Sequence, residues 1–420
     1  MWSGRWVAPV AAGVLLAPVA ACSSSGSAAS QSAAKAPDAA ATITPANGVK
    51  KVRPEKGVQV SAAGGVLDQV TVQGAGKAVE GALSPDKKSW RTKWTLKPGT
   101  TYTVTAVAKN DGGKVTTTTS KFTTLKAPAS VSINDVTPSA RETVGVGMPI
   151  TVNFDNPVSN RDAVEQALEV RSTKSVEGAW RWITSQQVIF HTKAYWPAHT
   201  SVSLVAHMSG VRAGSKLYGT KDYTRTFKVG ASHIAKVSLK SDKSKVYVDG
   251  RLAKTIPVSG GMGGADSHGN DFRTTSGVHL AMGKLPEVWM TSPNIKKDEP
   301  GYYHELVLKD VQISNSGEYL HQSPGEYQCL GHRNCSHGCV RQSIAGAAWF
   351  YKLSNRGDII NITGTSRDLQ WNNGWGYWQM SWKKWVKGSA LEKPVMTTPL
   401  SPVAPTTPAA PPVSPTPAHS

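Results

Sequence analysis

Short runs of β-forming residues, interrupted by Gly, Pro and Asp, recur from residue 58 to residue 258 and constrain the fold more than any other feature. Clear examples are residues 69–72, 101–107, 150–154 and 201–205. Runs of this length between turn residues are typical of β-strands, and their repetition is typical of sandwiches and barrels. The chain is therefore expected to be mainly β.

Two consecutive stretches, residues 48–127 and 128–230, show the same pattern. In each, a turn containing Pro leads directly into a strand, at residues 97–104 and 196–202. Neither stretch contains a cysteine. We predict two tandem immunoglobulin-like β-sandwich domains that act as rigid spacers, with an additional wall-binding role left open.

The charge balance is strongly basic: 47 Lys and Arg face 28 Asp and Glu, a formal charge of +19 in 420 residues. Such a charge favours an anionic partner. The sequence shows no zinc finger, helix-turn-helix or aromatic RNA-binding signature, so no nucleic acid is expected and anionic wall polymers are the preferred partner. No apolar stretch beyond the N-terminus is long enough to span a bilayer, which excludes a polytopic membrane protein.

The two ends of the chain have compositions of their own. Residues 1–22 have the layout of an export signal, and residues 19–22, Val-Ala-Ala-Cys, resemble a bacterial lipobox that would place a lipid anchor on Cys22. In the alternative reading Cys22 is incidental and the signal is cut elsewhere. Residues 23–47 are predicted to be a disordered tether, and the Pro-rich residues 394–420 a disordered tail. We expect an extracytoplasmic protein anchored to the cell membrane and reaching into the wall.

Three cysteines remain once Cys22 is assigned to lipid: Cys329, Cys335 and Cys339. An odd number leaves at least one thiol unpaired. With five residues between them in an oxidising compartment, Cys329 and Cys335 are the preferred disulfide pair, while free thiols or a redox switch stay open.

Residue types alone leave the chemistry of Cys339 undecided. The charge and donors of His337 and Arg341 would favour a reactive thiolate, with His321 as the base. Three cysteines with His332 and His337 close by could instead hold zinc, or the cluster could be structural. The other eight histidines show no ligand spacing and are expected to fill surface or core positions.

The segment His321 with Ser336-His337-Gly338-Cys339-Val340-Arg341 resembles the signature of the YkuD-type L,D-transpeptidases. The layout is similar to that of the long actinobacterial lipoprotein form, with a catalytic domain at residues 231–365 and a Trp-rich extension at 366–393. The resemblance implies a β-rich catalytic domain that acts on peptidoglycan stem peptides without a metal or cofactor.

That resemblance also implies a mechanism. Cys339 would attack the carbonyl between the third residue of a tetrapeptide stem and its terminal D-Ala, and an amine of a neighbouring stem would resolve the acyl-enzyme into a 3→3 cross-link. His321 would carry the proton, oriented by the backbone carbonyl at Gln322, where close relatives commonly have Ser. Carbapenems would be covalent inhibitors. The alternative is a wall-binding lipoprotein with weak or no activity.

Further roles follow from the same resemblance at matching positions. Gly338 and Cys339 would supply oxyanion-hole N–H groups, His337 would support the nucleophile, and Met290 would lie on a lid. Arg341 stands where close relatives have Asn, so stem recognition could differ. The residues implied to bind substrate are Tyr303, Ser316, Gly317, Asn334, Ser336 and Arg341.

The extension carries five tryptophans, spaced by 4, 3, 4 and 3 residues from Trp371 to Trp385. On a helix they would form one apolar stripe, but Gly374 and Gly376 argue against a continuous helix. We expect a strap that packs onto the catalytic domain, with stacking on glycan sugars as the alternative.

Overall fold

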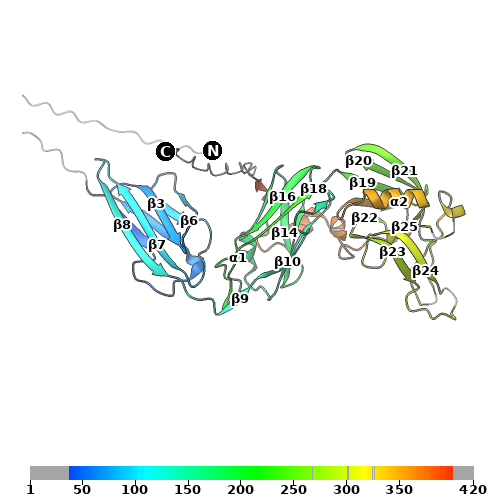
Figure 1. The fold of residues 1–420 in the computed structure, drawn as a ribbon, viewed down its shortest axis with the longest axis horizontal. Coiled ribbons are helices and arrows are strands. Elements are labelled where there is room, and N and C mark those ends of the chain that lie inside the picture. The colour runs from blue at the N-terminus through cyan, green and yellow to red at the C-terminus, as the bar shows by residue number, and fades with distance from the viewer. Residues whose placement is uncertain (1–36, 267, 300–301, 324, 326, 401–420) are drawn as a thin grey trace, which may run out of the picture.

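The computed structural model describes residues 37–400, apart from 267, 300–301, 324 and 326. Three β-rich units follow one another along the long axis of the molecule (Figure 1). The predicted signal peptide with Cys22, residues 23–36 of the predicted tether and residues 401–420 of the predicted tail lie outside the described residues. No helix among the described residues is long and apolar enough to cross a bilayer.

The first unit is a sandwich of two four-stranded sheets around a core that includes Leu67, Val104 and Phe122. Its 3-10 turn is η1 (Pro54–Lys56). One sheet has the order β1 (Ala40–Thr44), β2 (Gln59–Ala63), β6 (Ser89–Thr92), β5 (Gly81–Leu83), and the other β4 (Lys77–Ala78), β3 (Val66–Gly74), β7 (Thr101–Lys109), β8 (Val115–Thr123). Strand β1 corrects the prediction that residues 23–47 are all tether. Its alternating Ala41 and Ile43 are buried, so even this Ala- and Thr-rich run can form an edge strand.

The second unit is also a sandwich, with a core of Val, Ile, Phe and Trp side chains. It carries helix α1 (Arg161–Gln166) and a small parallel pair, β9 (Ala129–Val131) with β17 (Leu217–Gly219). Its two sheets have the orders β10 (Ile133–Thr137), β12 (Ile150–Phe154), β15 (Gln187–Thr192), β14 (Glu177–Trp182), β28 (Val395–Met396), and β11 (Thr143–Val144), β18 (Tyr223–Val229), β16 (Thr200–Ala206), β13 (Leu168–Ser172), β29 (Thr398–Pro399).

Strands β28 and β29 come from residues predicted to belong to the disordered tail, and this prediction was wrong for residues 395–399. Each strand extends the edge of one sheet of the second unit: β28 pairs with β14 and β29 with β13. Pro399 is tolerated because an edge strand needs to donate hydrogen bonds on one side only.

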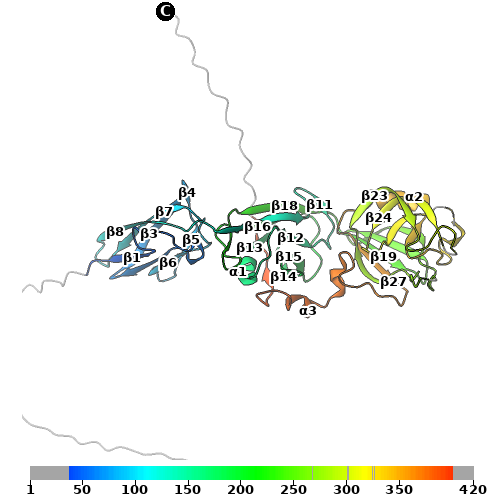
Figure 2. The same cartoon turned by 90° about the horizontal axis from the view of Figure 1, so that it is seen from below.

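The Trp-rich segment, residues 366–394, runs back along the second unit, where Figure 2 shows helix α3 beneath β14. It contains η3 (Gly376–Gln379) and α3 (Trp382–Val386) in place of a continuous helix. The Trp385 indole is 1% exposed and donates to the Ala179 carbonyl at 3.0 Å. The sequence-based prediction that this strap packs onto the catalytic domain is wrong for most of its length. It packs largely onto the second unit, because Ala179 and Ile189 there present an apolar surface to its indoles.

The third unit is built on a nine-stranded sheet that wraps around a core of its own. Helix α2 (Ile344–Leu353) packs against β24 and β25, and η2 (Tyr327–Cys329) precedes the segment that contains Cys339. The strand order is β22 (Gly277–Leu280), β27 (Ile359–Thr363), β19 (His233–Ser238), β20 (Lys243–Val248), β21 (Arg251–Ser259), β26 (Val340–Gln342), β25 (Tyr319–Gln322), β24 (His304–Gln312), β23 (Gly283–Thr291). The mainly β fold class is thus confirmed.

Candidate active site

Strands β25 and β26 bring the two motif segments together. They pair in parallel with Leu320 opposite Val340 and His321 opposite Arg341. Leu320 and Val340 are buried in the core, so the alternation of side chains turns His321 and Arg341 to the opposite face. Cys339 lies two residues before Arg341 and faces the same way.

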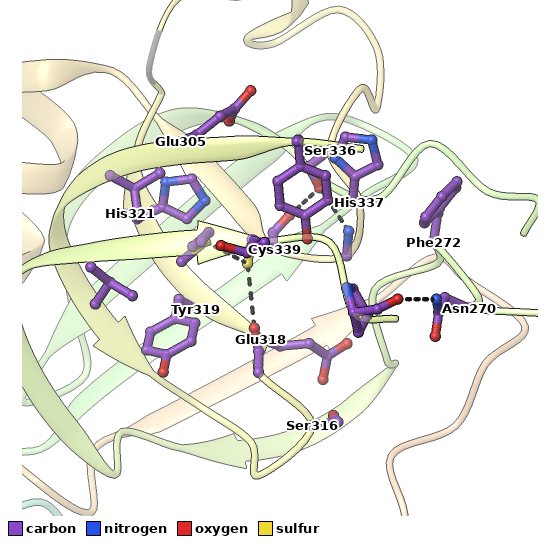
Figure 3. Close-up of a pocket in the computed structure, with 18 of the residues that line it drawn as sticks. Asn270, Phe272, Glu305, Ser316, Glu318, Tyr319, His321, Ser336, His337 and Cys339 are labelled. Carbon is purple, nitrogen blue, oxygen red and sulfur yellow. Dashed lines mark hydrogen bonds between the residues drawn. The ribbon is translucent and has the colours of Figure 1, made fainter. Parts of the chain in front are cut away.

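This face lines a cavity of about 530 Å³. Figure 3 shows Cys339 at its centre, with His321, Tyr319 and His337 around it. The hairpin of β23 and β24 forms another wall, from which Met290 and Glu305 reach the cavity. The sequence-predicted nucleophile and base therefore open onto one common space.

His321 is held in one tautomer. The side chain is 2% exposed, and its Nδ1–H donates to the Gln322 carbonyl at 2.7 Å, as the resemblance implied. Burial lowers the pKa of His321 to about 4, so the ring is neutral at neutral pH. Its Nε2 is then an acceptor that is able to take a proton.

The thiol of Cys339 is half-buried, with Sγ 3.7 Å from the Gly317 carbonyl oxygen and 4.0 Å from the Met290 sulfur. Burial raises the pKa of this thiol to about 12, and the nearby carboxylates of Glu318 and Asp310 act in the same direction. The free site therefore holds a neutral thiol beside a neutral imidazole.

This electrostatic setting corrects the expectation that His337 and Arg341 favour a thiolate. Burial lowers the pKa of His337, which leaves its ring uncharged. Arg341 Nη2 lies 3.7 Å from Glu305 Oε2, so its charge is opposed by a carboxylate. These two residues therefore do not favour a thiolate at Cys339 in the free site.

Comparisons with known proteins agree with this geometry. A family model described as the L,D-transpeptidase catalytic domain matches residues 232–362, and one described as a bacterial Ig domain matches residues 49–212. L,D-transpeptidase 5 of Mycobacterium tuberculosis is 31% identical over 360 residues, which cover 84% of this chain and 77% of that protein. L,D-transpeptidase 2 of the same species is 31% identical over 358 residues, covering 84% and 85%.

The chain belongs to the L,D-transpeptidase family. It is thus an acyltransferase of a family in which a cysteine nucleophile is general. Among solved structures, L,D-transpeptidase 3 from Mycobacterium tuberculosis in complex with a faropenem-derived adduct is 26% identical, with a TM-score of 0.45, over 56% of this chain and 98% of that one.

The loop before Cys339 is fixed by hydrogen bonds within the motif. Ser336 Oγ donates to the Cys339 carbonyl at 2.6 Å and accepts from the Gly338 N–H at 3.2 Å. Gly338 has φ +133°, a conformation that glycine adopts without strain. Its N–H is engaged by Ser336, which argues against the predicted oxyanion role of Gly338 and leaves the Cys339 N–H of that pair.

His337 and Tyr303 form a wall of the cavity. Their rings stack with centroids 4.5 Å apart, and Phe272 meets the other side of His337 at 4.9 Å. Burial raises the pKa of Tyr303, so its hydroxyl stays a neutral donor. His337 is thus held by ring contacts, and Tyr303 lies at the cavity as predicted for a substrate-binding residue.

Of the other predicted L,D-transpeptidase substrate residues, Ser316, Gly317, Ser336 and Arg341 line the cavity. Asn334 does not, which corrects its predicted substrate contact. Its amide accepts from the Gly260 N–H at 2.8 Å and donates to the Leu239 carbonyl at 2.9 Å. Both ends of the amide are used to fasten the loop to the sheet.

Cys329 and Cys335 are joined in a disulfide, and Cys339 is the free thiol among the described residues. Cys335 N–H also donates to Ser259 Oγ at 3.0 Å, which ties this loop to β21. This disulfide uses two of the three sulfur atoms that the alternative zinc site would need as ligands. Among the described residues, no group of three or more His, Cys, Asp or Glu is arranged to hold a metal.

Sequence reasoning missed three polar residues near Cys339, which are Glu305, Glu318 and Thr275. Glu305 and Glu318 line the cavity, and Thr275 is bonded to Glu318. An acidic residue directly after the predicted Ser316-Gly317 pair was a signal that could have drawn attention to Glu318. Thr275 lies 64 residues before Cys339 in an irregular loop and has no sequence signal of its own.

Proposed function

We propose that this L,D-transpeptidase forms 3→3 peptidoglycan cross-links through an acyl-enzyme on Cys339. The observation that carries the proposal is the pairing of β25 with β26, which directs His321 and Cys339 into one cavity. The donor substrate is a tetrapeptide stem that loses its terminal D-Ala.

In the first half-reaction, His321 Nε2 takes the thiol proton as Sγ attacks the carbonyl that precedes D-Ala. The tetrahedral oxyanion is placed to accept from the Cys339 N–H. Collapse breaks the amide bond, and the proton on His321 passes to the departing D-Ala amine. The enzyme keeps the stem as a thioester.

In the second half-reaction, the side-chain amine of a neighbouring stem attacks the thioester. His321 removes the proton that the amine loses and returns it to the Cys339 sulfur, so the thiol is regenerated with the new amide bond. Burial keeps the His321 imidazole unprotonated at neutral pH, so Nε2 is open to accept a proton as the bond between sulfur and carbon forms.

We also propose an extracytoplasmic location with a lipid anchor on Cys22, and contact with anionic wall polymers. The lipobox-like residues 19–22 and the formal charge of +19 support this. The disulfide between Cys329 and Cys335 fits an oxidising compartment. Cys22→Ser should release the protein from the membrane fraction, and unchanged membrane retention would contradict the anchor.

Intact-protein mass spectrometry tests the reaction. The protein is incubated with a carbapenem, whose strained lactam should acylate the thiol, and separately with a disaccharide tetrapeptide. We expect a covalent adduct, free D-Ala and a cross-linked dimer with the unaltered chain, and none of these with Cys339→Ala. If neither reagent acylates the folded protein, the wall-binding lipoprotein with weak or no activity becomes the better account.

A further inference from the structure

Hydrogen bonds and bonds along the chain form a closed ring that runs through Cys339, which we call the circuit. The Cys339 thiol donates to the Gly317 carbonyl at 3.7 Å, and the next residue, Glu318, accepts from the N–H and hydroxyl of Thr275 at 2.7 and 2.6 Å. The preceding residue, Thr274, donates its hydroxyl to the Gly338 carbonyl at 2.7 Å. Since Gly338 is bonded to Cys339, the circuit closes on the nucleophile itself.

Each of the two loops that flank the thiol turns at a glycine with a positive φ angle. Gly317 has φ +87° and Gly338 has φ +133°. A β-carbon placed on either residue would meet no atom within 4 Å. Hydrogen bonds from Thr274 and Thr275 join the two loops to each other, in addition to bonds that hold each loop separately, such as those between Asn373 and Ser316.

The partner of this circuit is a histidine that sequence reasoning had assigned to surface or core filling. His279 is fully buried, and its Nε2 lies 2.8 Å from Thr275 Oγ1. The Thr275 hydroxyl donates to Glu318, and His279 Nδ1 lies 3.2 Å from the Gly277 carbonyl oxygen, so the imidazole is held at both of its nitrogens. Glu318 and Thr275 are 4% and 3% exposed.

A buried carboxylate that is held by a hydroxyl and an N–H is a costly way to stabilise a fold. No Lys or Arg forms an ion pair with Glu318 among the described residues, where its nearest cationic candidate is His279 at 3.9 Å. Because Glu318 lies beside the thiol, its costly bonding to Thr275 is better explained by a role in the reaction than by a role in stability.

We propose that Glu318 and Thr275 are positioning residues for acyl transfer, which hold the Gly317 carbonyl against the Cys339 thiol and thereby set the direction in which the sulfur meets the substrate. This inference rests on the proposed function for its role in catalysis. The S–H of a neutral thiol can turn among staggered positions, and fixed contacts with the Gly317 carbonyl and the Met290 sulfur limit where Sγ and its proton lie before the proton passes to His321. Correct direction of the attacking atom is worth orders of magnitude in rate.

Thr275→Val tests the circuit most directly, because valine keeps the shape and the N–H bond and removes only the hydroxyl. We expect the rate constant of carbapenem acylation at saturation to fall about 10- to 100-fold, with little change in the half-saturating concentration. Thr275→Ser restores the hydroxyl and should recover most of the rate. Thr192→Val, at a buried threonine of the second unit, is the matched control and should acylate normally.

A spectroscopic readout makes the test independent of substrate. In a Cys22→Ser background of the full chain, Cys339 is the single free thiol, and its S–H stretching band reports the hydrogen bond to Gly317. The band should move to the position of an unbonded thiol in Thr275→Val and return in Thr275→Ser. If Thr275→Val does not fold, the isosteric Glu318→Gln keeps the bond from the Thr275 N–H and should shift the same band.

The measurements distinguish a failure of the circuit from a failure of the proposed function. An unshifted band with wild-type acylation in Thr275→Val would overturn the circuit, and so would a Thr275→Ser variant that is as slow as Thr275→Val. A wild-type protein that no carbapenem acylates would refute the proposed function, while the S–H band would still decide whether the circuit holds the thiol.

Discussion

The two junctions of this chain are built differently, although each joins one β-rich unit to the next. At the first junction, Trp94 stacks on His207 with ring centroids 3.7 Å apart, and Thr95 Oγ1 donates to the Ser209 carbonyl at 2.7 Å. These are contacts between loops. Each sandwich keeps a core of its own on either side.

At the second junction the core of the second sandwich is shared with the catalytic unit, which also keeps a further core of its own. Leu280 and Ile359, from strands of the catalytic unit, are buried in the core of the second sandwich. Backbone N–H groups of Gly145 and Gly147 donate to the carbonyls of Arg356 and Gly357 at 2.8 and 2.9 Å. The strap then covers the second sandwich from outside.

This difference between the two junctions indicates which units unfold together. A loop contact can open without disturbing either neighbour, whereas a shared core must be broken before either part can unfold. We therefore expect the second sandwich and the catalytic unit to unfold as one body, with the first sandwich separate.

Trp385→Ala should give the largest effect. Removing this buried indole from the strap is expected to lower the free energy of unfolding by about 3 to 5 kcal/mol. Because the cores are shared, denaturant titration should show the second sandwich and the catalytic unit destabilised together. Trp289→Ala, at an indole that is 60% exposed, is the stability control. If the substitution destabilised only the second sandwich, the prediction that it unfolds together with the catalytic unit would be refuted.

Acid should weaken the same region. His191 lies among the indoles of Trp378, Trp382 and Trp385, and burial lowers its pKa to about 3. Since the unfolded histidine titrates near 6.5, stability is present above that pH and is lost as the pH falls toward 3, by about 3 kcal/mol between pH 7 and pH 4.

His191→Phe isolates this contribution, because other buried histidines remain in both proteins. The variant should lose less stability than the unaltered chain over the same pH range, as measured by urea unfolding at pH 7 and pH 4. Equal losses in the two proteins would show that His191 does not become protonated on unfolding.

Trp94→Ala probes the first junction and should have a smaller effect. Loss of a half-buried ring stack is expected to cost about 1 kcal/mol. The transition of the catalytic unit and its acylation rate should not change, while X-ray scattering in solution should show a wider spread of angles between the two sandwiches. A shift in the catalytic transition would mean that the two junctions are alike.

Glu142→Gln should give the smallest effect. Glu142 Oε2 lies 3.4 Å from Arg356 Nη1 across the second junction, and the arginine is partly exposed. Water screens such pairs, so the loss should be about 0.5 kcal/mol in thermal unfolding. A loss several times larger would mean that ion pairs, and not the shared apolar core, supply most of the stability of this junction.

The resemblance to a family signature predicted that His321 and Cys339 act together, whereas residue types alone left the role of Cys339 open. The two segments lie on or beside strands β25 and β26, which are neighbours in the sheet. The strand periodicity likewise predicted β7 and β16, which begin after their Pro-containing turns at Thr101 and Thr200.

Other features depend on partners far away in the chain. Asn334 could be assigned to substrate because nothing in its neighbourhood reveals that Gly260 and Leu239 will occupy its amide. The protonation of Cys339 depends on burial that only the assembled cavity creates. Residues 395–399 form strands because two sheet edges are open to them, although their composition is that of a tail.

The late position of β28 and β29 has a consequence for the order in which the protein is made. The second sandwich begins near residue 129, yet its edges and the bonds from Ser389 and Ala390 to the buried Glu165 come from more than 220 residues further along. A chain that is synthesised from its N-terminus cannot finish this domain until the whole catalytic unit has emerged. The second sandwich can therefore be completed only in a chain that includes β28 and β29, and a prematurely terminated chain would display unpaired sheet edges.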